Sequence, residues 1–258
     1  MDIVVNGHAV FVATGGVDFD PALPVLVLLH GAGMDHSAWA QQSRALAHGG
    51  FAVLAPDLPG HGRSAGPALT RVEDVADWLD ALLAALAVER AIVAGHSLGG
   101  LVALDFAARY PERTVRAVIL GGAAAMPVHD DLLKAARDAL PRAIAMIIGW
   151  GFAQPLAPSP VPGLSLTASG KALLARSKPG VLHADLSACA GYAGGEAAAE
   201  AVNVPVTLIH GSADRMVPLK AARALAAKLN GARVVEIAGA GHMVQLENPP
   251  AVLAALRA

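Results

Sequence analysis

One stretch of the chain decides its fold: Ala91-Ile92-Val93-Ala94-Gly95-His96-Ser97-Leu98-Gly99-Gly100-Leu101-Val102-Ala103-Leu104. It begins with small and β-branched residues that suit a buried strand, and residues 98–110 repeat apolar side chains at helical spacing. Between them, Gly95-x-Ser97-x-Gly99 favours a sharp strand-to-helix turn over a chance serine and glycine loop, because glycines let the two elements approach closely. The turn lifts the Ser97 hydroxyl clear of the sheet, so the sequence predicts a nucleophile there, with the Leu98 amide facing a developing oxyanion.

The length and charge of the chain limit its fold and its partners. A chain of 258 residues is long enough for one sizeable α/β domain with an insertion. Its net charge of −2 is spread without blocks of one sign, so we expect neither nucleic acid nor an anionic membrane surface as a partner. The single cysteine, Cys189, can form no internal disulfide, and residues 1–11 lack a secretory pattern. We therefore expect a cytoplasmic protein, a monomer or homodimer, with a small-molecule partner.

The longest run without a charged residue, 143–170, is not expected to span a membrane. Its compact apolar part, 143–153, is too short to cross a bilayer. Four prolines interrupt any continuous helix: Pro155, Pro158, Pro160 and Pro162.

Strand and helix patterns alternate along most of the chain. Two short strands, 3–5 and 8–13, flank Asn6-Gly7 and predict an antiparallel hairpin. Residues 25–29 form a continuous apolar run, which is typical of a strand covered on both faces. The alternation from there predicts parallel pairing with helices on both sides of the sheet. Further strands are predicted over 51–55, 91–94, 115–120, 204–210 and 233–237, and helices over 37–48, 72–87, 98–110, 218–230 and 247–257.

The alternation stops in one long segment. Residues 122–202 contain no convincing strand and several weak helices, such as 130–140 and 171–177. We interpret this segment as a helical cap inserted into a core domain of residues 1–121 and 203–258, folded over the mouth of the site. Its apolar residues either line that mouth or pack the cap's own core. The candidate substrate contacts are Met34, Met146, Trp150 and Met216.

A serine nucleophile requires a base and an acid that orients the base. Of ten histidines, only His242 lies in a glycine-rich loop after the last predicted strand. Asp214 ends the loop after the preceding strand, and the order Ser97, Asp214, His242 is the one that this kind of turn requires. We therefore predict His242 as the base and Asp214 as the orienting acid.

Other histidines and aspartates offer alternatives. His30 and His61 lie in glycine-rich loops near the same edge, but each is expected to hold its own loop by hydrogen bonds. His96 adjoins the nucleophile in sequence, so its side chain should project elsewhere from the sharp turn. The alternative acids, which lie several residues into the insertion, are Asp130 and Asp131.

These motifs resemble the α/β-hydrolase superfamily of serine hydrolases, over nearly all of the chain outside 121–202. His30-Gly31-Ala32-Gly33 resembles the family's oxyanion loop, which implies that the amide of Ala32 joins that of Leu98. The resemblance further implies a mostly parallel eight-stranded sheet, helices on both faces and the cap after the sixth strand. The other matching segments are Asp57-Leu58-Pro59-Gly60-His61-Gly62-Arg63-Ser64, as in single-cap esterases and C–C hydrolases, Gly211-Ser212-Ala213-Asp214 and Gly241-His242.

The expected reaction is hydrolysis of carboxylic esters of small, largely apolar substrates through an acyl-serine. No cofactor and no metal are expected, because the sequence has neither a dinucleotide fingerprint nor metal-ligand spacing. The same triad also supports C–C bond hydrolysis of ring-cleavage diketones, or thioester or lactone cleavage. A ligand-binding protein without catalysis is the alternative of another class. Cations that keep the diketone alternative open are Lys134, Arg137, Arg142, Lys171, Arg176 and Lys178.

Overall fold

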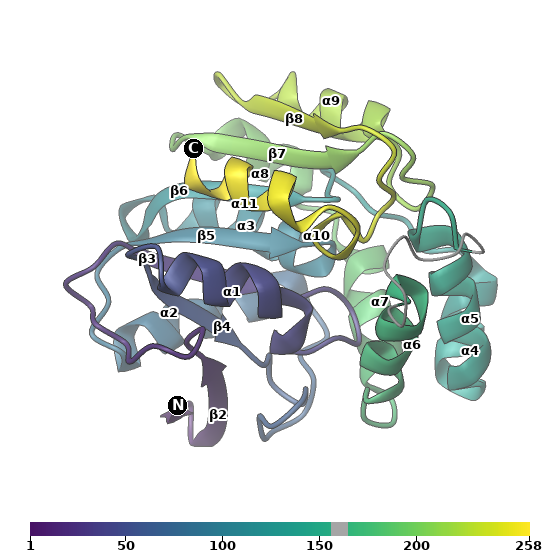
Figure 1. Cartoon of the computed structure of the whole chain (residues 1–258), viewed down its shortest axis with the longest axis horizontal. Coiled ribbons are helices and arrows are strands. Elements are labelled where there is room, and N and C mark those ends of the chain that lie inside the picture. The colour runs from purple at the N-terminus through teal and green to yellow at the C-terminus, as the bar shows by residue number, and fades with distance from the viewer. Residues whose placement is uncertain (156–164) are drawn as a thin grey trace.

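A computed structural model describes residues 1–155 and 165–258 of the chain. Its strands form one eight-stranded sheet in the order β1-β2-β4-β3-β5-β6-β7-β8 (Figure 1). β1 and β2 pair antiparallel, β2 is antiparallel to β4, and the remaining neighbours are parallel. The predicted mostly parallel eight-stranded sheet is therefore confirmed. The strands are β1 (Asp2–Val5), β2 (His8–Ala13), β3 (Val25–Leu29), β4 (Ala52–Pro56), β5 (Ala91–His96), β6 (Thr114–Leu120), β7 (Val206–Gly211) and β8 (Arg233–Ile237).

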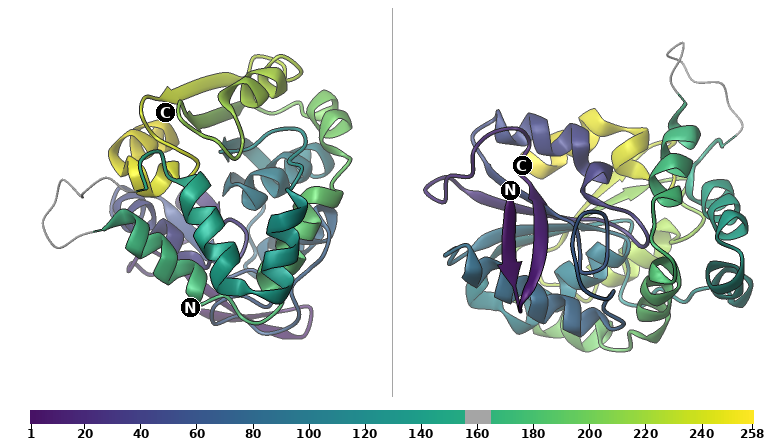
Figure 2. Two further views of the ribbon diagram at one scale, coloured as in Figure 1. Left: turned by 90° about the vertical axis from the view of Figure 1, so that its right-hand side faces the viewer. Right: turned by 90° about the horizontal axis from the view of Figure 1, so that it is seen from below.

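Helices cover both faces of this sheet, as predicted. α1 and α11 lie on one face, and α2 and α3 lie on the other (Figures 1 and 2). The bounds of the helices outside the β6–β7 connection are α1 (Ala40–Ala47), α2 (Val72–Ala85), α3 (Leu98–Arg109), α9 (Leu219–Ala226), α10 (Val244–Glu247) and α11 (Pro249–Arg257), with short 3-10 turns at His36–Trp39 and Pro111–Arg113.

Two helix predictions near the C-terminus extend too far. The helix predicted over 218–230 ends at Ala226, and the chain turns before Gly231, whose φ is +67°. The helix predicted over 247–257 begins two residues later, at Pro249, because Asn248 leaves the helical conformation and its side chain caps α11 at the amide of Ala251; residue 247 ends the separate short helix α10. Pro249 starts the second helix, where its fixed φ is favourable and a missing N–H costs nothing.

The core explains why the strand sequences are continuously apolar. In β3, Leu26 and Leu28 pack in the cluster beneath α1 and α11, whereas Val27 and Leu29 pack in the cluster beneath α2 and α3. Because successive side chains of a strand point to opposite faces, every position of β3 is buried. A rigid sheet with both faces covered fixes the positions of the loops at its carboxyl edge.

The segment between β6 and β7 is helical in the residues that the structure describes. The helices α4 to α7 lie across the carboxyl edge of the sheet, and the left view of Figure 2 looks onto them. The last one, α8, packs instead on α3, where Ala198 and Ala199 join Leu104 and Ala107 in one apolar cluster. Pro158, Pro160 and Pro162 lie outside the described residues. The bounds are α4 (Asp130–Asp138), α5 (Leu140–Gly151), α6 (Leu166–Ala175), α7 (Val181–Gly191) and α8 (Gly195–Ala201).

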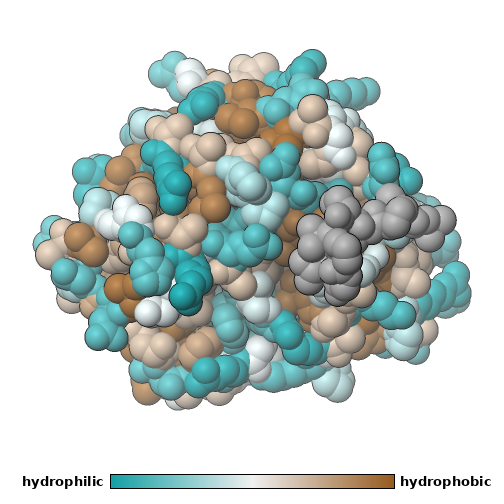
Figure 3. All heavy atoms as spheres, viewed as in Figure 1, coloured by the Kyte–Doolittle hydropathy of each residue, from teal (hydrophilic) through white to brown (hydrophobic). Residues whose placement is uncertain are grey.

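Across residues 1–155 and 165–258, every helix is too short or too polar to cross a membrane. On the face seen in Figure 3, hydrophilic and hydrophobic residues are intermixed over the sheet and its covering helices. The large apolar side chains are mostly inside, where Trp39 and Phe106 are fully buried.

Candidate active site

The turn between β5 and α3 has the strained geometry that the sequence predicts. Ser97 has φ 54° and ψ −115°, a backbone conformation that residues other than glycine rarely adopt. A Cβ on Gly99 would lie 2.5 Å from the backbone oxygen of Leu29, and a Cβ on Gly95 would overlap the backbone of Gly99. Only glycine fits at both positions, so strand, turn and helix hold Ser97 at the carboxyl edge of the sheet.

Asp214 and His242 come together from two neighbouring strand-end loops. His242 Nδ1 lies 2.9 Å from Asp214 Oδ2, and both side chains are buried. The second carboxylate oxygen, Oδ1, accepts hydrogen bonds from the amides of Met216 (2.9 Å) and Val217 (2.8 Å). The acid is thus fixed by its own loop before it contacts the imidazole.

The partners of this pair determine its protonation. Burial raises the pKa of the Asp214 carboxyl, but the charge and hydrogen bond of His242 and the amide of Val217 outweigh burial and hold that pKa below its usual value. Since an ionised carboxylate only accepts, Nδ1 of His242 carries the proton. In the neutral form of this ring the lone pair is therefore on Nε2, which has no hydrogen-bond partner among residues 1–155 and 165–258.

Ser97 and His242 flank the end of β6. The Ser97 amide donates to Leu120 O at 2.9 Å, and the next residue, Gly121, packs against the imidazole: a Cβ there would lie 3.1 Å from His242 Cε1. The two side chains line the same cavity. No hydrogen bond joins the Ser97 hydroxyl to the imidazole within the described part of the chain, and such bonds often tighten only once substrate is present.

The loop His30-Gly31-Ala32-Gly33, called the oxyanion loop below, lies beside Ser97. A Cβ on Gly31 would be 3.4 Å from Ser97 Cβ. Leu98 begins α3, so its amide has no partner within the helix. The amide of Ala32 likewise donates to no acceptor in the residues that the structure describes. Among the described residues, an N–H group without an acceptor is thus present in the loop beside Ser97, and a second one directly follows Ser97 in the chain.

A cavity of about 320 Å³ opens onto Ser97 and His242, and its walls are mainly apolar. Trp150 and Met216, two of the four candidate contacts, line it. Met34 is buried in the core, Met146 packs against the same core, and neither belongs to this lining, so their contact with substrate stays a prediction. The other lining residues are Met126, Pro127, Val128, His129, Leu132, Leu186, Cys189, Arg215 and Val217.

The alternative bases and acids have other partners. His30 Nε2 accepts from the amide of Leu58 (3.1 Å) while Nδ1 faces Gly31 O (2.9 Å), and burial beside His61 lowers its pKa to about 4. It therefore joins the oxyanion loop to the loop after β4. Asp130 and Asp131 are exposed in the first turn of α4, outside the cavity lining.

His96 has a specific partner that its position in sequence did not reveal. Its Nε2 lies 2.9 Å from the backbone oxygen of His242. Burial, then the neighbouring His242 ring, lower the pKa of His96 to about 3, so it is neutral and donates from Nε2. A Cβ on Gly31 would come within 2.8 Å of its Nδ1. His96 thus packs between the oxyanion loop and the loop that carries His242.

The end of α5 is bonded to the His242 loop. Gly151 O accepts from the amide of His242 at 2.7 Å. Glu247 accepts from the amides of Gly241 and Ala153, each at 2.9 Å, and so joins the loop to the second residue after α5. Sequence reasoning missed Glu247 because each contact depends on chain approach in three dimensions. The only available signal is a carboxylate five residues after His242.

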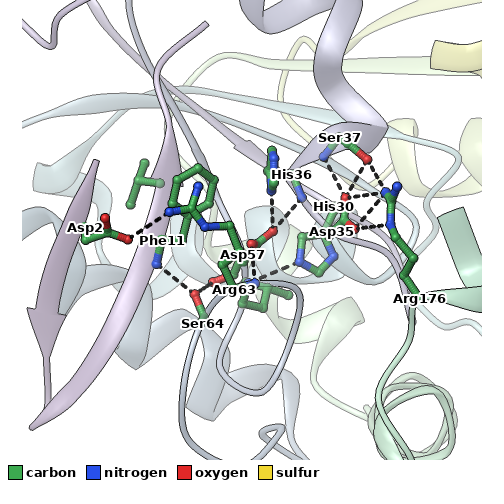
Figure 4. Close-up of polar contacts among 12 residues, drawn as sticks. Asp2, Phe11, His30, Asp35, His36, Ser37, Asp57, Arg63, Ser64 and Arg176 are labelled. Carbon is green, nitrogen blue, oxygen red and sulfur yellow. Dashed lines mark hydrogen bonds and ion pairs between the residues drawn. The ribbon is translucent and has the colours of Figure 1, made fainter. Parts of the chain in front are cut away.

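A second polar cluster, Asp35, His36 and Asp57, has the atom spacing of a metal site. Its groups already have protein partners, as Figure 4 shows: Asp57 accepts from His36 Nδ1 at 2.8 Å, and Arg176 binds Asp35 through two nitrogens at 3.1 Å. Asp57 also accepts from the amide of Arg63 at 2.9 Å. These bonds fold the loop after β4 and anchor α6 to the body, and they leave the carboxylates few free lone pairs.

Comparison with known proteins agrees with this architecture. Residues 26–256 match the family described as the Alpha/beta hydrolase family. The chain belongs to this family. It is 35% identical over 246 residues, covering 88% of this chain and 94% of the relative, to a pimeloyl-[acyl-carrier protein] methyl ester esterase of Aromatoleum aromaticum. It is 31% identical over 242 residues, 85% of this chain and 80% of the relative, to a putative non-heme haloperoxidase of Mycobacterium phage D29.

The solved structures give the same fold. An enol-lactonase from Burkholderia xenovorans LB400 superposes with a TM-score of 0.87 over 100% of this chain and 98% of its own, at 24% identity. Similarity at that level of identity supports the α/β-hydrolase fold, and it does not identify the substrate of this chain.

Proposed function

We propose that this α/β hydrolase is a serine hydrolase that cleaves carboxylic esters of small, largely apolar substrates through an acyl-serine intermediate. One observation carries the proposal: Ser97 and a His242 imidazole bonded to Asp214 open onto the same apolar cavity. Relatives named as esterases support it. In this proposal Ser97, Asp214 and His242 are the catalytic residues, and Ala32 and Leu98 provide the oxyanion hole.

The proposed reaction has two halves. His242 Nε2 takes the hydroxyl proton as Ser97 Oγ bonds to the carbonyl carbon, and the carbonyl oxygen becomes an oxyanion held by the Ala32 and Leu98 amides. The imidazolium then gives its proton to the leaving alkoxide, the C–O bond breaks and the acyl-serine remains. Water attacks that ester while His242 takes its proton, and the acid leaves as Ser97 is regenerated.

The cavity favours an ester over a ring-cleavage diketone. A diketone with its carboxylate needs a cationic group in the pocket, and the lining contains one arginine, Arg215. Its Nη2 donates to Gly149 O and Phe152 O, so only Nε and Nη1 of this one arginine could meet a substrate carboxylate. Two cations of the segment between β6 and β7 are engaged elsewhere, since Arg176 binds Asp35 and Lys178 donates to Ser64 O at 2.9 Å.

Ester hydrolysis is tested with p-nitrophenyl acetate and butyrate. We expect the wild-type protein to turn over both, and Ser97→Ala to lose at least about 10³-fold in kcat because the nucleophile is gone. Ser187→Ala is the matched control, since the Ser187 hydroxyl bonds within α7 to His183 O and lies outside the cavity lining. Parallel assays with a thioester, a lactone and a ring-cleavage diketone rank the alternatives. An inactive wild-type protein, or an active Ser97→Ala, contradicts the proposal.

A cytoplasmic location and a monomeric or homodimeric state complete the proposal. Cell fractionation and light scattering of the purified protein test them. The ligand-binding alternative predicts that no p-nitrophenyl ester is turned over while a small apolar ligand still binds the cavity.

A further inference from the structure

We infer that Asp185, a buried carboxylate on α7, is a positioning residue that holds the oxyanion loop in its working geometry. The inference rests on the proposed ester hydrolysis. Asp185 Oδ2 accepts from the amide of Gly33 at 2.7 Å and lies 2.7 Å from Nε2 of His61. It therefore connects α7 with two strand-end loops at the same point.

The contacts of the His61 ring match those of an imidazolium that faces a carboxylate. Nδ1 of His61 faces the backbone oxygen of Pro59 at 3.0 Å, and Nε2 faces the Asp185 carboxylate. Both ring nitrogens face oxygens, and although burial lowers the pKa of His61, the Asp185 charge and hydrogen bond raise it, so we assign a proton to each nitrogen. The two side chains are each only 2% exposed. The His61 cation thus stabilises the charged form of Asp185, which is a stronger acceptor for the Gly33 N–H than a neutral carboxyl would be.

The hydrogen bond from the Gly33 amide to Asp185 helps to orient the neighbouring Ala32 amide, which would hold the oxyanion. Residues 31–34 form a turn in which Gly31 O accepts from Met34 N at 3.1 Å, with Gly33 at φ +67°. Gly31 O also faces His30 Nδ1 at 2.9 Å. Because a peptide group is planar, anchoring Gly31 O fixes the direction of the Ala32 N–H on the same peptide. Asp185 anchors the next peptide, so both planes around Ala32 are held.

Close packing reinforces the contact. A Cβ on Gly33 would lie 2.8 Å from Leu182 Cδ1, so α7 lies directly on the loop. One turn of α7 thus supplies an apolar contact from Leu182 and a charged acceptor from Asp185. The oxyanion loop cannot shift toward α7, and it loses a strong hydrogen bond if it moves away.

Asp185→Asn removes the charge at nearly constant volume, and it cannot satisfy both partners. If the side-chain nitrogen of the introduced asparagine takes the Oδ2 position, two donors face each other and the Gly33 N–H has no acceptor there. With its oxygen there, it leaves the His61 imidazolium buried without a counter-charge. Either way the Gly33 anchor is lost or weakened, and the Ala32 amide is no longer held.

The experiment measures kcat, KM and two inhibition constants for the wild-type protein and Asp185→Asn. We expect kcat for p-nitrophenyl butyrate to fall about tenfold or more, since loss of a whole oxyanion donor costs about 10²–10³, with KM within about twofold. A trifluoromethyl ketone forms an oxyanion when the serine adds to it. Its inhibition constant should rise by about the same factor by which kcat/KM falls. That of butyrate, the acid product, should not change.

Asp105→Asn is the matched control. Asp105 is a buried carboxylate on α3 that accepts from Tyr192 at 2.9 Å, so it also connects the end of α7 to the body, but it does not touch the oxyanion loop. We expect it to lower the midpoint of thermal unfolding with kcat unchanged. A purely structural role for Asp185 predicts the same result for both variants.

Each outcome decides the inference. A folded Asp185→Asn protein with wild-type kcat and wild-type ketone inhibition overturns the inference. The proposed function is unaffected by that result, because the wild-type protein is still active. An inactive wild-type protein refutes the proposed function and the inference together. Should Asp185→Asn fail to fold, His61→Gln is measured in its place: we expect at least a threefold fall in kcat with weaker ketone inhibition, and unchanged values refute the role.

Discussion

Within the described residues, two buried histidine–aspartate pairs at the carboxyl edge of this sheet are joined at 2.9 Å or less, and they differ in what the second ring nitrogen meets. In the His242–Asp214 pair (2.9 Å), Nε2 has no partner in the described residues and the ring lines the cavity. In the His61–Asp185 pair (2.7 Å), the other nitrogen meets the backbone oxygen of Pro59. The same two residue types therefore leave one ring nitrogen open to the cavity in one place and engage both ring nitrogens in the other.

The comparison shows that a short contact between histidine and aspartate does not identify a catalytic base. We expect a catalytic base to have, in addition, a free ring nitrogen and space in front of it, as His242 has. The pairs also differ in what they join: Asp214 and His242 both belong to strand-end loops, whereas Asp185 reaches the body from α7. One pair is suited to move a proton, and the other to hold two parts of the chain together.

The largest expected effect separates the two histidines. We expect His242→Gln to lower kcat for p-nitrophenyl butyrate by about 10³-fold or more, because the proposed reaction needs the imidazole to accept the Ser97 proton. His61→Gln should lower kcat far less, since it perturbs only the support of the oxyanion loop. Steady-state kinetics of the two variants check this, with circular dichroism to confirm folding. Equal losses would show that the distinction between the pairs is wrong.

The two pairs should also lose their contributions to stability at opposite ends of the pH range. Burial lowers the pKa of His61, but the Asp185 charge and hydrogen bond outweigh it and the pKa is raised. The pair therefore stabilises the fold fully below the unfolded histidine pKa of about 6.5, and loses this as pH rises through the higher folded value. The Asp214 pKa is lowered, so its contribution is present above about pH 3.8 and is lost as pH falls through the folded value.

Urea unfolding of the wild-type protein and His61→Leu checks the alkaline limb. We expect the variant to be about 3–5 kcal/mol less stable at pH 6, because it leaves a buried carboxylate unpaired. The difference in free energy of unfolding should shrink as pH rises above 6.5. A difference that grows with pH would mean that His61 is neutral in the folded protein.

The smallest expected effect lies on the open side of His242. Trp150 lines the cavity and is 37% exposed, so Trp150→Ala should raise KM for a p-nitrophenyl hexanoate substrate about threefold with kcat unchanged, which is a loss of under about 1 kcal/mol of binding. Val115→Ala, a 43% exposed apolar residue outside the cavity, is the control. Identical KM values for both variants would show that the apolar wall does not contact the acyl chain.

The sheet and its turn were predictable because their sequence patterns have one physical solution. The continuous apolar run of β3 requires cover on both faces. The close approach of β5 and α3 permits only glycine at positions 95 and 99. Chain order placed Asp214 and His242 in neighbouring strand-end loops, and the structure pairs them. Their catalytic roles stay predictions.

The segment between β6 and β7 was less predictable, because helical spacing does not say which side faces a cavity. Of the four candidate contacts, Trp150 and Met216 line the cavity, whereas Met34 packs inside the core. Asp185 and Gly33 are 152 positions apart, and an aspartate in an alanine-rich helix looks like a solvated residue until the fold places it against that amide. Such contacts depend on how helices dock, which a single sequence does not encode locally.

The central claim is that the Ser97 hydroxyl is activated by His242, and labelling with a fluorophosphonate tests it most directly. Peptide mass spectrometry should find one phosphonate adduct, on Ser97, in the wild-type protein, and labelling should be at least about 10³-fold slower in His242→Gln. Absence of an adduct on Ser97 in the folded wild-type protein, or equally fast labelling without the imidazole, would contradict the account.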